Sequence, residues 1–425
     1  MKMIKTIKSD NNKEIEALKE RKSDLTSAIK IVQPIINDVK KNKDKALKKY
    51  AKKFDKISLT KIEISRSKIK AAYKKVDKKI ITALKQAAKN IEKYHELQMP
   101  KEWMKEISPG VKAGIIVRPL ESVGCYVPGG KYPLISSVLM NALPAKVAGV
   151  KNIIICTPNP VDEILAAADI AGVSKVFQIG GAQAIAAMAY GTETIPKTNK
   201  IVGPGNVFVT AAKKLVYGDV GVDFIAGPSE ILIIADKNSD PEFIAADMLS
   251  QAEHDEVSAS ILITPAKEIP GKVNKELKKQ LANLSTKRIA GTALKNNGII
   301  ILTKDIDESV KISNNIAPEH LEIMIDDENT QKKILKRINN AGAVFVGSYS
   351  VEAAGDYASG PNHVLPTGGF AKARAGLSIV DFIKTPTIQK LSKPGLKALE
   401  KTITTIAEAE GLIAHSNSAK IRFKK

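Results

Sequence analysis

Cysteine and aromatic residues are scarce in this chain of 425 residues, and each shortage excludes a class of protein. The two cysteines, Cys125 and Cys156, form no CxxC pair, so a disulfide framework is excluded and a reducing compartment is expected. Aromatic residues make up only 4%, whereas single-stranded nucleic acids are bound by basic surfaces interleaved with aromatic rings. The net charge of +21 comes mostly from lysines on predicted helix faces. We interpret it as a lysine-rich surface and expect no nucleic-acid partner, with a nucleic-acid-binding module kept as a minor alternative.

Long apolar segments are also missing. No run approaches the ~18 residues that a membrane-spanning helix needs, and the opening residues MKMIKTIKSDNNKEIE lack the apolar centre of a signal peptide. We therefore expect a cytoplasmic protein with no membrane partner. Apolar residues still make up 44% of a chain too long for one ordinary core, which predicts two or more domains.

The apolar pattern changes along the chain. Residues 11–97 carry apolar positions at helical spacing, which predicts helices over 25–39, 44–54, 68–76 and 78–97. The stretches on either side of Ser108-Pro109-Gly110 predict a hairpin. From residue 123, strand, glycine turn and helix alternate up to residue 216, and a second such series runs from 231 to 346. This alternation predicts an α/β fold with two doubly wound, Rossmann-like modules. The stretch from Gly376 onward has too little apolar material to fold alone, so we expect it to pack on something else.

Three glycine turns in the first series each follow a predicted strand and open a helix: Gly129-Gly130, Gly180-Gly181 and Gly203-Pro204-Gly205. None of them is a GxGxxG fingerprint, and a single turn of this kind needs glycine only for its backbone conformation. Three turns at the carboxyl ends of strands in one sheet favour a nucleotide crevice, because backbone amides at helix N-termini bind phosphates.

Histidine occurs five times, and four of these residues lie in short polar stretches. His254 ends a predicted helix over 241–254, three residues after Gln251, so both side chains should leave one face of the helix. Such a pair is usually a solvated polar face, but imidazole and oxygen donors also bind zinc. His95 lies in a lysine-rich helix and is predicted to be a surface residue.

Glu319-His320 pairs a carboxylate with an imidazole, the usual general base near neutral pH. A surface pair at a helix start is the alternative for these two residues taken alone. Asp356 follows Gly355 in a glycine-rich loop, where an aspartate is ordinarily a turn residue. Ser229 lacks the strand-to-helix elbow of a nucleophile, and we expect it to bind substrate.

Six motifs resemble those of the histidinol dehydrogenase family in order and approximate spacing: AGPSEILIIAD, LSQAEHD, NNIAPEHLEI, GDYASGPNHVLPTGG, GLSIVDF and EGLIAH. The resemblance covers almost the whole chain. It implies the last step of histidine biosynthesis, in which L-histidinol is oxidised through L-histidinaldehyde to L-histidine with two NAD+. It also implies one zinc ion per subunit and a homodimer.

The resemblance further implies a role for each motif residue. The zinc ligands would be Gln251, His254, Asp356 and His415, and the acid–base pair would be Glu319 and His320. The substrate would contact Ser229, His320, His363, Glu410 and the four zinc ligands. NAD would contact Tyr126, Gln183 and Asn206.

We expect three structural parts. Residues 1–120 would pack with 228–375 as one α/β domain that holds the zinc and catalytic residues, and 121–227 would form the NAD-binding domain. Residues 376–425 would be a small dimerisation segment exchanged between two chains, so that each active site is shared. A zinc-dependent hydrolase, with Glu319 activating water, is the alternative function, but it leaves the three glycine turns unexplained.

Overall fold

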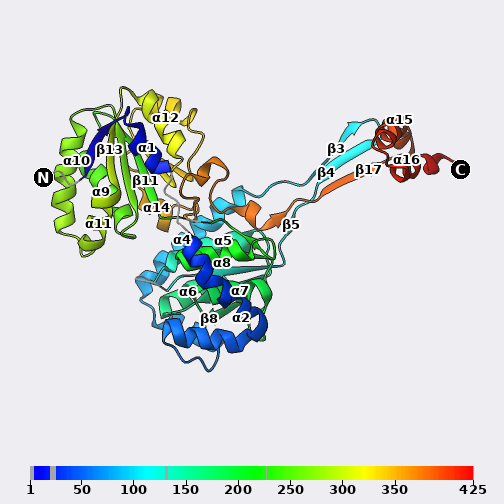
Figure 1. Ribbon diagram of the computed structural model, residues 1–425, viewed down its shortest axis with the longest axis horizontal. Coiled ribbons are helices and arrows are strands. Elements are labelled where there is room, and N and C mark those ends of the chain that lie inside the picture. Colours follow the sequence, from blue (N-terminus) through cyan, green and yellow to red (C-terminus); the bar gives the residue numbers. More distant parts are fainter. Residues whose placement is uncertain (1–3, 20–24, 130–132, 226, 425) are drawn as a thin grey trace.

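The computed structural model describes residues 4–19, 25–129, 133–225 and 227–424. Two α/β modules lie next to each other, and a long arm projects away from them (Figure 1). The predicted fold class is confirmed. Residues 20–24 of the predicted helical stretch and Gly130 of the first glycine turn lie outside the described residues. No helix in the described ranges is long and apolar enough to cross a membrane.

The first module contains a six-stranded sheet with the order β10-β9-β6-β7-β8-β2. Its parallel strands are β6 (Ser122–Tyr126), β7 (Asn152–Thr157), β8 (Lys175–Gln178), β9 (Lys200–Val202) and β10 (Gly221–Val222). Only β2 (Glu63–Ile64) runs antiparallel, beside β8. β7 and β8 lie on one side of β6, and β9 and β10 lie on the other. The chain thus reverses direction across the sheet at β6, and a crevice is expected at the carboxyl ends of β6 and β9.

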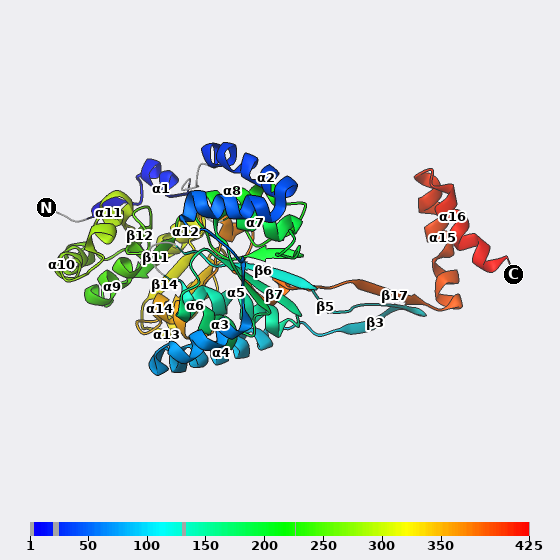
Figure 2. The same ribbon diagram turned by 90° about the horizontal axis from the view of Figure 1, so that it is seen from below.

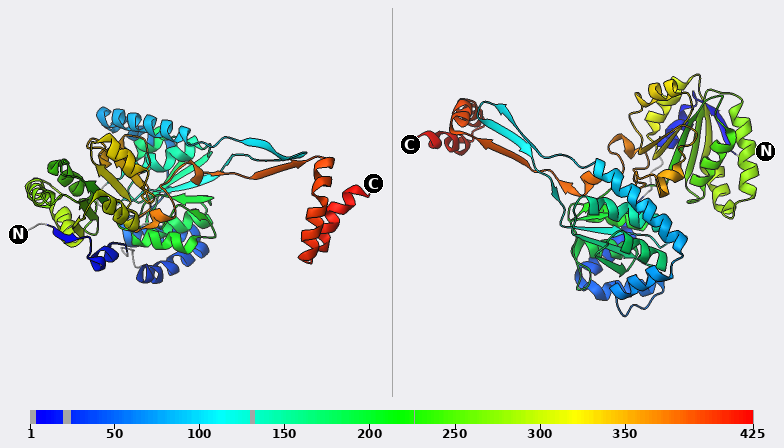
Figure 3. Two further views of the ribbon diagram at one scale, coloured as in Figure 1. Left: turned by 90° about the horizontal axis from the view of Figure 1, so that it is seen from above. Right: turned by 180° about the vertical axis from the view of Figure 1, so that it is seen from behind.

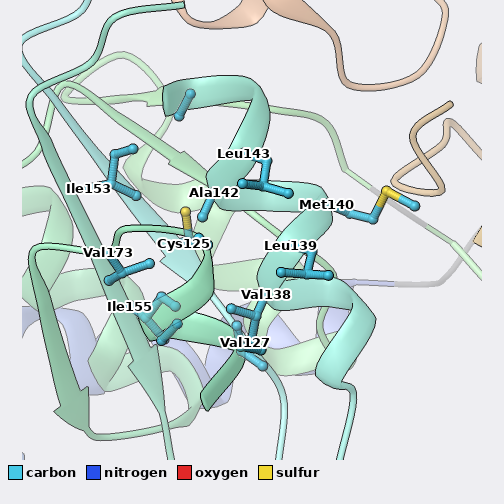
Figure 4. Close-up of a cluster of buried hydrophobic side chains, with 14 of the residues drawn as sticks. Cys125, Val127, Val138, Leu139, Met140, Ala142, Leu143, Ile153, Ile155 and Val173 are labelled. Carbon is cyan, nitrogen blue, oxygen red and sulfur yellow. The ribbon is translucent and has the colours of Figure 1, made fainter. Parts of the chain in front are cut away.

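Helices cover both faces of this sheet. One face carries α3 (Arg66–Lys75), α4 (Lys78–Leu97), α5 (Ile135–Val147) and α6 (Asp162–Ile170), and the other carries α2 (Thr26–Tyr50), α7 (Gly181–Tyr190) and α8 (Val207–Val216). Figure 4 shows Val138 of α5 close to Val127 and Ile155, and all three belong to one buried cluster. The strands are apolar on both faces because helices bury both sides of a parallel sheet.

The N-terminal helices pack on a different module from the one we predicted. Only β1 (Lys5–Lys8) and α1 (Asn12–Lys19) join the second module, where β1 pairs with β13. Helix α2 instead buries Val32, Ile36 and Leu47 in the core that it shares with α7 and α8, and α3 and α4 pack on α6 and α5. The expected grouping of 1–120 with 228–375 is therefore wrong for α2–α4. An amphipathic pattern identifies the buried face of a helix but not the surface that covers it.

Two local predictions in the helical region also need correction. The helices predicted over 25–39 and 44–54 form one element, α2, interrupted at Lys43 (φ 49°) and continued by the π-helical turn η1 (Ala51–Asp55). His95, predicted at the surface, is fully buried in α4, where its Nδ1 lies 2.8 Å from the carbonyl oxygen of Ile91. Burial lowers the pKa of His95, so the core holds a neutral imidazole.

The second module contains a parallel sheet with the order β1-β13-β12-β11-β14-β15. Its other strands are β11 (Glu230–Ala235), β12 (Ala259–Thr264), β13 (Gly298–Leu302), β14 (His320–Met324) and β15 (Ala343–Val346). One face is covered by α9 (Pro241–Ala252), α10 (Ile269–Ala282) and α11 (Lys287–Asn297), and the other by α1, α12 (Ile306–Ile316) and α13 (Glu328–Leu335). The short helix α14 (Glu352–Tyr357) follows β15.

We call residues 103–115 and 387–424 the arm. The predicted hairpin is confirmed as β3 (Trp103–Ser108) and β4 (Val111–Ile115), and β17 (Thr387–Leu391) pairs with β4. Helices α15 (Lys393–Ala409) and α16 (Ile413–Lys420) form its tip, well away from both modules (Figures 2 and 3). The tip exposes Ile413 and Ile421 by 54% and 63%.

The C-terminal segment leaves the modules later than the predicted boundary at residue 376. Ile379, Phe382 and Ile383 belong to the core of the first module, and β16 (Ile383–Lys384) pairs with β5 (Arg118–Pro119). Of this C-terminal segment, only the residues from β17 onward belong to the arm.

Candidate active site

The cleft between the modules is lined by opposite edges of the two sheets. Gly203 and Gly205 follow β9 at the carboxyl edge of the first sheet, whereas Ser229 precedes β11 and His320 begins β14 at the amino edge of the second. All four residues line one cavity of about 220 Å³. Ligands of parallel sheets usually bind at carboxyl ends. The second module departs from this rule, because Ser229 and His320, with which it lines the cavity, lie at strand starts.

His320 is buried in this cavity and is held as a neutral imidazole. Its Nδ1 lies 3.2 Å from the carbonyl oxygen of Glu230, which can only accept a hydrogen bond, so Nδ1 carries the proton. Its Nε2 has no hydrogen-bond partner among the described residues and lies 4.0 Å from Oδ1 of Asp356. Burial lowers the pKa of His320 to about 4, so the imidazole is uncharged at pH 7. The free Nε2 lone pair can therefore accept a proton from a ligand in the cavity.

Glu319 also bonds to the backbone of Glu230, but through the N–H and not through the carbonyl oxygen that faces His320. Its Oε2 accepts a hydrogen bond of 2.9 Å from the backbone N–H of Glu230 and lies 3.7 Å from Nδ1 of His320. Burial raises the pKa of Glu319 well above its usual value of 4.5. A carboxyl group with a raised pKa can exchange protons with water near neutral pH.

Metal-binding atoms gather on the other wall of the cavity. Ligand atoms of His254, Glu352 and Asp356 all lie within 4.8 Å of one another. Gln251 lines the same cavity, and its buried Oε1 has no hydrogen-bond partner within the described part of the chain. These nitrogen and oxygen donors fit zinc, and a buried carbonyl oxygen without a hydrogen bond is available as a further ligand.

Two of these residues lie on elements other than those predicted. Helix α9 ends at Ala252, so His254 belongs to the following turn and does not share a helical face with Gln251. Asp356 lies in α14 and not in a glycine-rich loop. Sequence reasoning missed Glu352, whose position four residues before Asp356 was the available signal, because that spacing puts both carboxylates on one side of a helix.

The remaining predicted substrate contacts divide into two groups. Ser229 and His363 line the cavity, and Nδ1 of His363 lies 3.0 Å from the carbonyl oxygen of Asp356. Glu410 and His415 lie instead at the tip of the arm, exposed and remote from the cavity of the same chain (Figure 2). One chain therefore brings together every predicted zinc, catalytic and substrate residue except these two.

A second pocket, of about 420 Å³, brings together all three residues predicted to contact NAD. The Oη of Tyr126 accepts a hydrogen bond of 3.1 Å from the backbone N–H of Gly181, and Asn206 caps α8 through its side-chain oxygen. Gln183 is buried, and its Nε2 has no hydrogen-bond partner in the described ranges. The pocket lies at the carboxyl ends of β6, β8 and β9, where the glycine turns predicted a nucleotide crevice.

The turn at Gly203 separates the two pockets and is held rigidly. Gly203 has a φ of +114°, and a Cβ there would lie 2.2 Å from the carbonyl oxygen of Tyr126, so only glycine fits. Asp223 accepts a 2.8 Å hydrogen bond from the N–H of Gly203, and Lys213 donates to its carbonyl oxygen. Lys213 and Asp223 form a buried ion pair of 2.6 Å. No motif in the sequence pointed to these two residues.

The chain matches the histidinol dehydrogenase family over residues 18–423. It is 51% identical over 421 residues to histidinol dehydrogenase of Clostridium acetobutylicum, with 98% of this chain and 97% of that protein covered. The chain belongs to the histidinol dehydrogenase family. It is also 46% identical over 427 residues to the histidinol dehydrogenase of Methanothermobacter thermautotrophicus, which covers 99% and 100% of the two chains. The crystal structure of histidinol dehydrogenase from Elizabethkingia anophelis is similar with a TM-score of 0.95 and 42% identity, covering 100% of this chain and 99% of that one.

Membership of the histidinol dehydrogenase family confirms the resemblance drawn from the six motifs and makes the protein an oxidoreductase. A cluster of buried carboxyl groups lies beside the candidate site, with Oε1 of Glu352 3.6 Å from Nδ1 of His320. Glu322 is two residues beyond His320 on β14, and its Oε1 accepts a 2.9 Å hydrogen bond from the backbone N–H of Glu352. Burial, and next the charge of Asp247, raise the pKa of Glu322 well above 4.5, and burial raises the pKa of Asp247 to about 6.

This cluster predicts a pH dependence of folding stability. The pKa of Glu322 is higher in the folded protein than in the unfolded chain, so its contribution is fully present below about pH 4.5 and is lost as the pH rises through the folded value. Glu322→Gln removes this titration and keeps the acceptor for Glu352. We expect the free energy of unfolding of Glu322→Gln, minus that of the unchanged protein, to rise between pH 4.5 and 8. The expected rise is about 1.4 kcal/mol for each unit by which the pKa is raised.

Urea denaturation at a series of pH values measures this difference. Glu268→Gln, at an exposed position of the same module, is the control for loss of a carboxyl group. A difference for Glu322→Gln that stays constant from pH 4.5 to 8 would contradict the raised pKa.

Proposed function

We propose that this chain oxidises L-histidinol through L-histidinaldehyde to L-histidine, the final step of histidine biosynthesis, with NAD as the hydride acceptor and zinc as the bound metal. The observation that carries the proposal is the neutral His320 with a free Nε2, beside Glu319 and opposite a set of metal donors. The names of the relatives support the substrate. A zinc hydrolase could use the same donors but would leave the pocket around Tyr126, Gln183 and Asn206 unexplained.

His320 and Glu319 divide the proton transfers between the two oxidations. In the first, Nε2 of His320 accepts the hydroxyl proton of histidinol while a hydride leaves the adjoining carbon, which gives the aldehyde. In the second, Glu319 accepts a proton from water as that water adds to the aldehyde carbon. In the same addition His320 returns the proton from the first step to the aldehyde oxygen, which gives a neutral hydrate and a neutral imidazole. The hydrate then loses a hydride while His320 accepts one of its hydroxyl protons, and becomes the carboxylic acid. NAD, when bound, supplies the hydride acceptor for both steps.

Gln251, His254 and Asp356 are the residues of this chain that would hold zinc, with Glu352 within reach. Zinc, when bound, would supply a Lewis acid for the imidazole and amine nitrogens of histidinol. Ser229 and His363 line the same cavity and would orient the substrate beside His320.

We further propose a homodimer in which the arm of each chain completes the active site of the other. An apolar hollow of about 510 Å³ opens next to His254 and Asp356, and Leu84 and Met140 are among its lining residues. The arm carries the exposed His415 at its tip together with unpaired apolar surface, which suits such a hollow. Closed two-fold symmetry would create two equivalent shared sites. The two buried, unpaired cysteines support a cytoplasmic location.

The oxidation is tested by counting NADH formed for each histidinol consumed. We expect two NADH per histidinol, loss of activity after dialysis against a strong chelator, and recovery when zinc is added back. His254→Ala should bind less zinc while its thermal unfolding stays close to that of the unchanged protein, because His254 is an exposed residue outside the core. Full turnover by metal-free protein would contradict the zinc requirement, and one NADH per histidinol would contradict the second oxidation.

The shared site is tested by mixing two inactive variants, His254→Ala and His415→Ala, under conditions that let subunits exchange. If His415 completes the site of the other chain, each mixed dimer has one site with both lesions and one with none. Random association then restores activity to about a quarter of all sites. The control mixture pairs His254→Ala with Asp356→Ala, which both alter the same module and should recover nothing. An inactive His254/His415 mixture, with exchange demonstrated by mass-labelled subunits, would contradict the shared site.

A further inference from the structure

The pocket around Tyr126, Gln183 and Asn206 contains one charged side chain among the described residues that line it, Asp55. The other lining residues are apolar, aromatic or neutral and polar, with Phe54 and Phe208 on its walls. A charged group in an otherwise neutral pocket has a large influence on which ligand binds, because few other charges compete with it. Asp55 plays no part in the proton transfers derived above.

Asp55 presents a carboxylate without a partner. It ends η1, and the next residue, Lys56, turns the chain away with a φ of 60°. Although lysines flank it, Lys56 donates to the carbonyl oxygen of Lys53 and Lys53 lies over the ring of Phe54. The carboxylate of Asp55 has no hydrogen bond or ion pair within the ranges that the structure describes, and burial raises its pKa. A half-buried acceptor of this kind is left for a ligand to satisfy.

The arrangement of the two pockets indicates which half of a dinucleotide reaches Asp55. They share the turn from Gly203 to Asn206, and the donors and bases for the reaction lie only in the cleft on the His320 side. Hydride transfer requires the nicotinamide ring in that cleft, so the pocket of Asp55 receives the adenosine half. Phe54 and Phe208 are 46% and 40% exposed and offer aromatic surface for a purine.

We propose that Asp55 makes the site selective for NAD over NADP, by accepting hydrogen bonds from the adenosine ribose hydroxyls and repelling a 2′-phosphate. The inference rests on the proposed use of NAD. A carboxylate accepts but cannot donate, so it matches the hydroxyl donors of NAD and is mismatched to the phosphate of NADP. In dinucleotide folds an acidic residue about 20 residues after the glycine turn has this role. Here the acidic residue lies at the end of η1, before β6 and the glycine turns, so no fingerprint in the sequence revealed it.

The charge of Asp55 affects the pKa of Tyr126 in the same pocket. Burial, together with the charge of Asp55, raises the pKa of Tyr126 to about 12, so the phenol keeps its proton and offers a donor toward the ligand. Tyr126 thus remains neutral at every pH at which the enzyme would work. Asp55 is then the negative charge that a 2′-phosphate would face first.

The test measures binding and needs no turnover. NADH and NADPH are titrated into the protein without histidinol, and the change in nicotinamide fluorescence gives both dissociation constants. We expect the unchanged protein to prefer NADH, and Asp55→Asn, which keeps the size and removes the charge, to reduce this preference at least about tenfold. Asp10→Asn makes the same charge change at an exposed position of the second module and should leave the preference unaltered.

The outcomes separate this inference from the proposed function. If the unchanged protein binds NADH and Asp55→Asn keeps the full preference, Asp55 is not the selective residue and the use of NAD stands. If the unchanged protein binds neither dinucleotide, the use of NAD fails and this inference fails with it. As a second measurement, adenosine 2′,5′-bisphosphate should displace NADH from Asp55→Asn better than from the unchanged protein, and equal displacement would also contradict the proposal. Thermal unfolding of Asp55→Asn should be unchanged or higher, since the substitution removes a half-buried, unpaired charge.

Discussion

The register between β11 and β14 determines where the two candidate catalytic side chains lie. It pairs Ile231 with His320, and this brings the peptide groups of Glu230 beside both residues. The carbonyl oxygen of Glu230 accepts the Nδ1 proton of His320, and its backbone N–H donates to Glu319. One strand start therefore sets the tautomer of the imidazole and the position of the carboxylate. A slip of one residue would turn His320 to the opposite face of the sheet.

This constraint explains why the active site sits at an unusual edge of the second sheet. The candidate catalytic pair lies at strand starts of the second sheet, and the cavity forms where this edge meets the carboxyl end of the first sheet, with its glycine turns. The turn at Gly203 connects the two pockets. Gly203 lines the cavity of His320, and Asn206, three residues later, lines the pocket of Tyr126 and Gln183. Removing either member of the buried Lys213–Asp223 pair that clamps it would leave an uncompensated charge, a loss of about 3–5 kcal/mol.

Local patterns in the sequence predicted the helices and strands, because these elements depend mostly on residues close together in the chain. Helix α4 begins and ends where its apolar spacing predicted, and the alternation of strand and helix gave both parallel sheets. The residues of the cavity were found through their motifs and the family resemblance, since Gln251, Glu319 and Asp356 carry no individual signal. The predictions that were wrong concern packing between segments that are distant in the chain. His95 has the sequence surroundings of a surface residue, yet α4 turns it into the core, and the module that receives α2 follows from surface shape. Glu352 and Asp55 were missed because each lies outside the recognised motif residues.

Glu230 of β11 positions both Glu319 and His320, and the most direct test separates the different tasks that we propose for these two residues. Glu319→Gln and His320→Ala are each supplied with histidinol and, separately, with histidinaldehyde, and NADH formation is followed for each substrate. We expect Glu319→Gln to slow oxidation of the aldehyde by about 100-fold or more while largely preserving oxidation of the alcohol, because only the aldehyde needs an added water. His320→Ala should slow both by a similar factor. Equal, small losses in both variants with both substrates would contradict the account and assign the proton transfers to other residues.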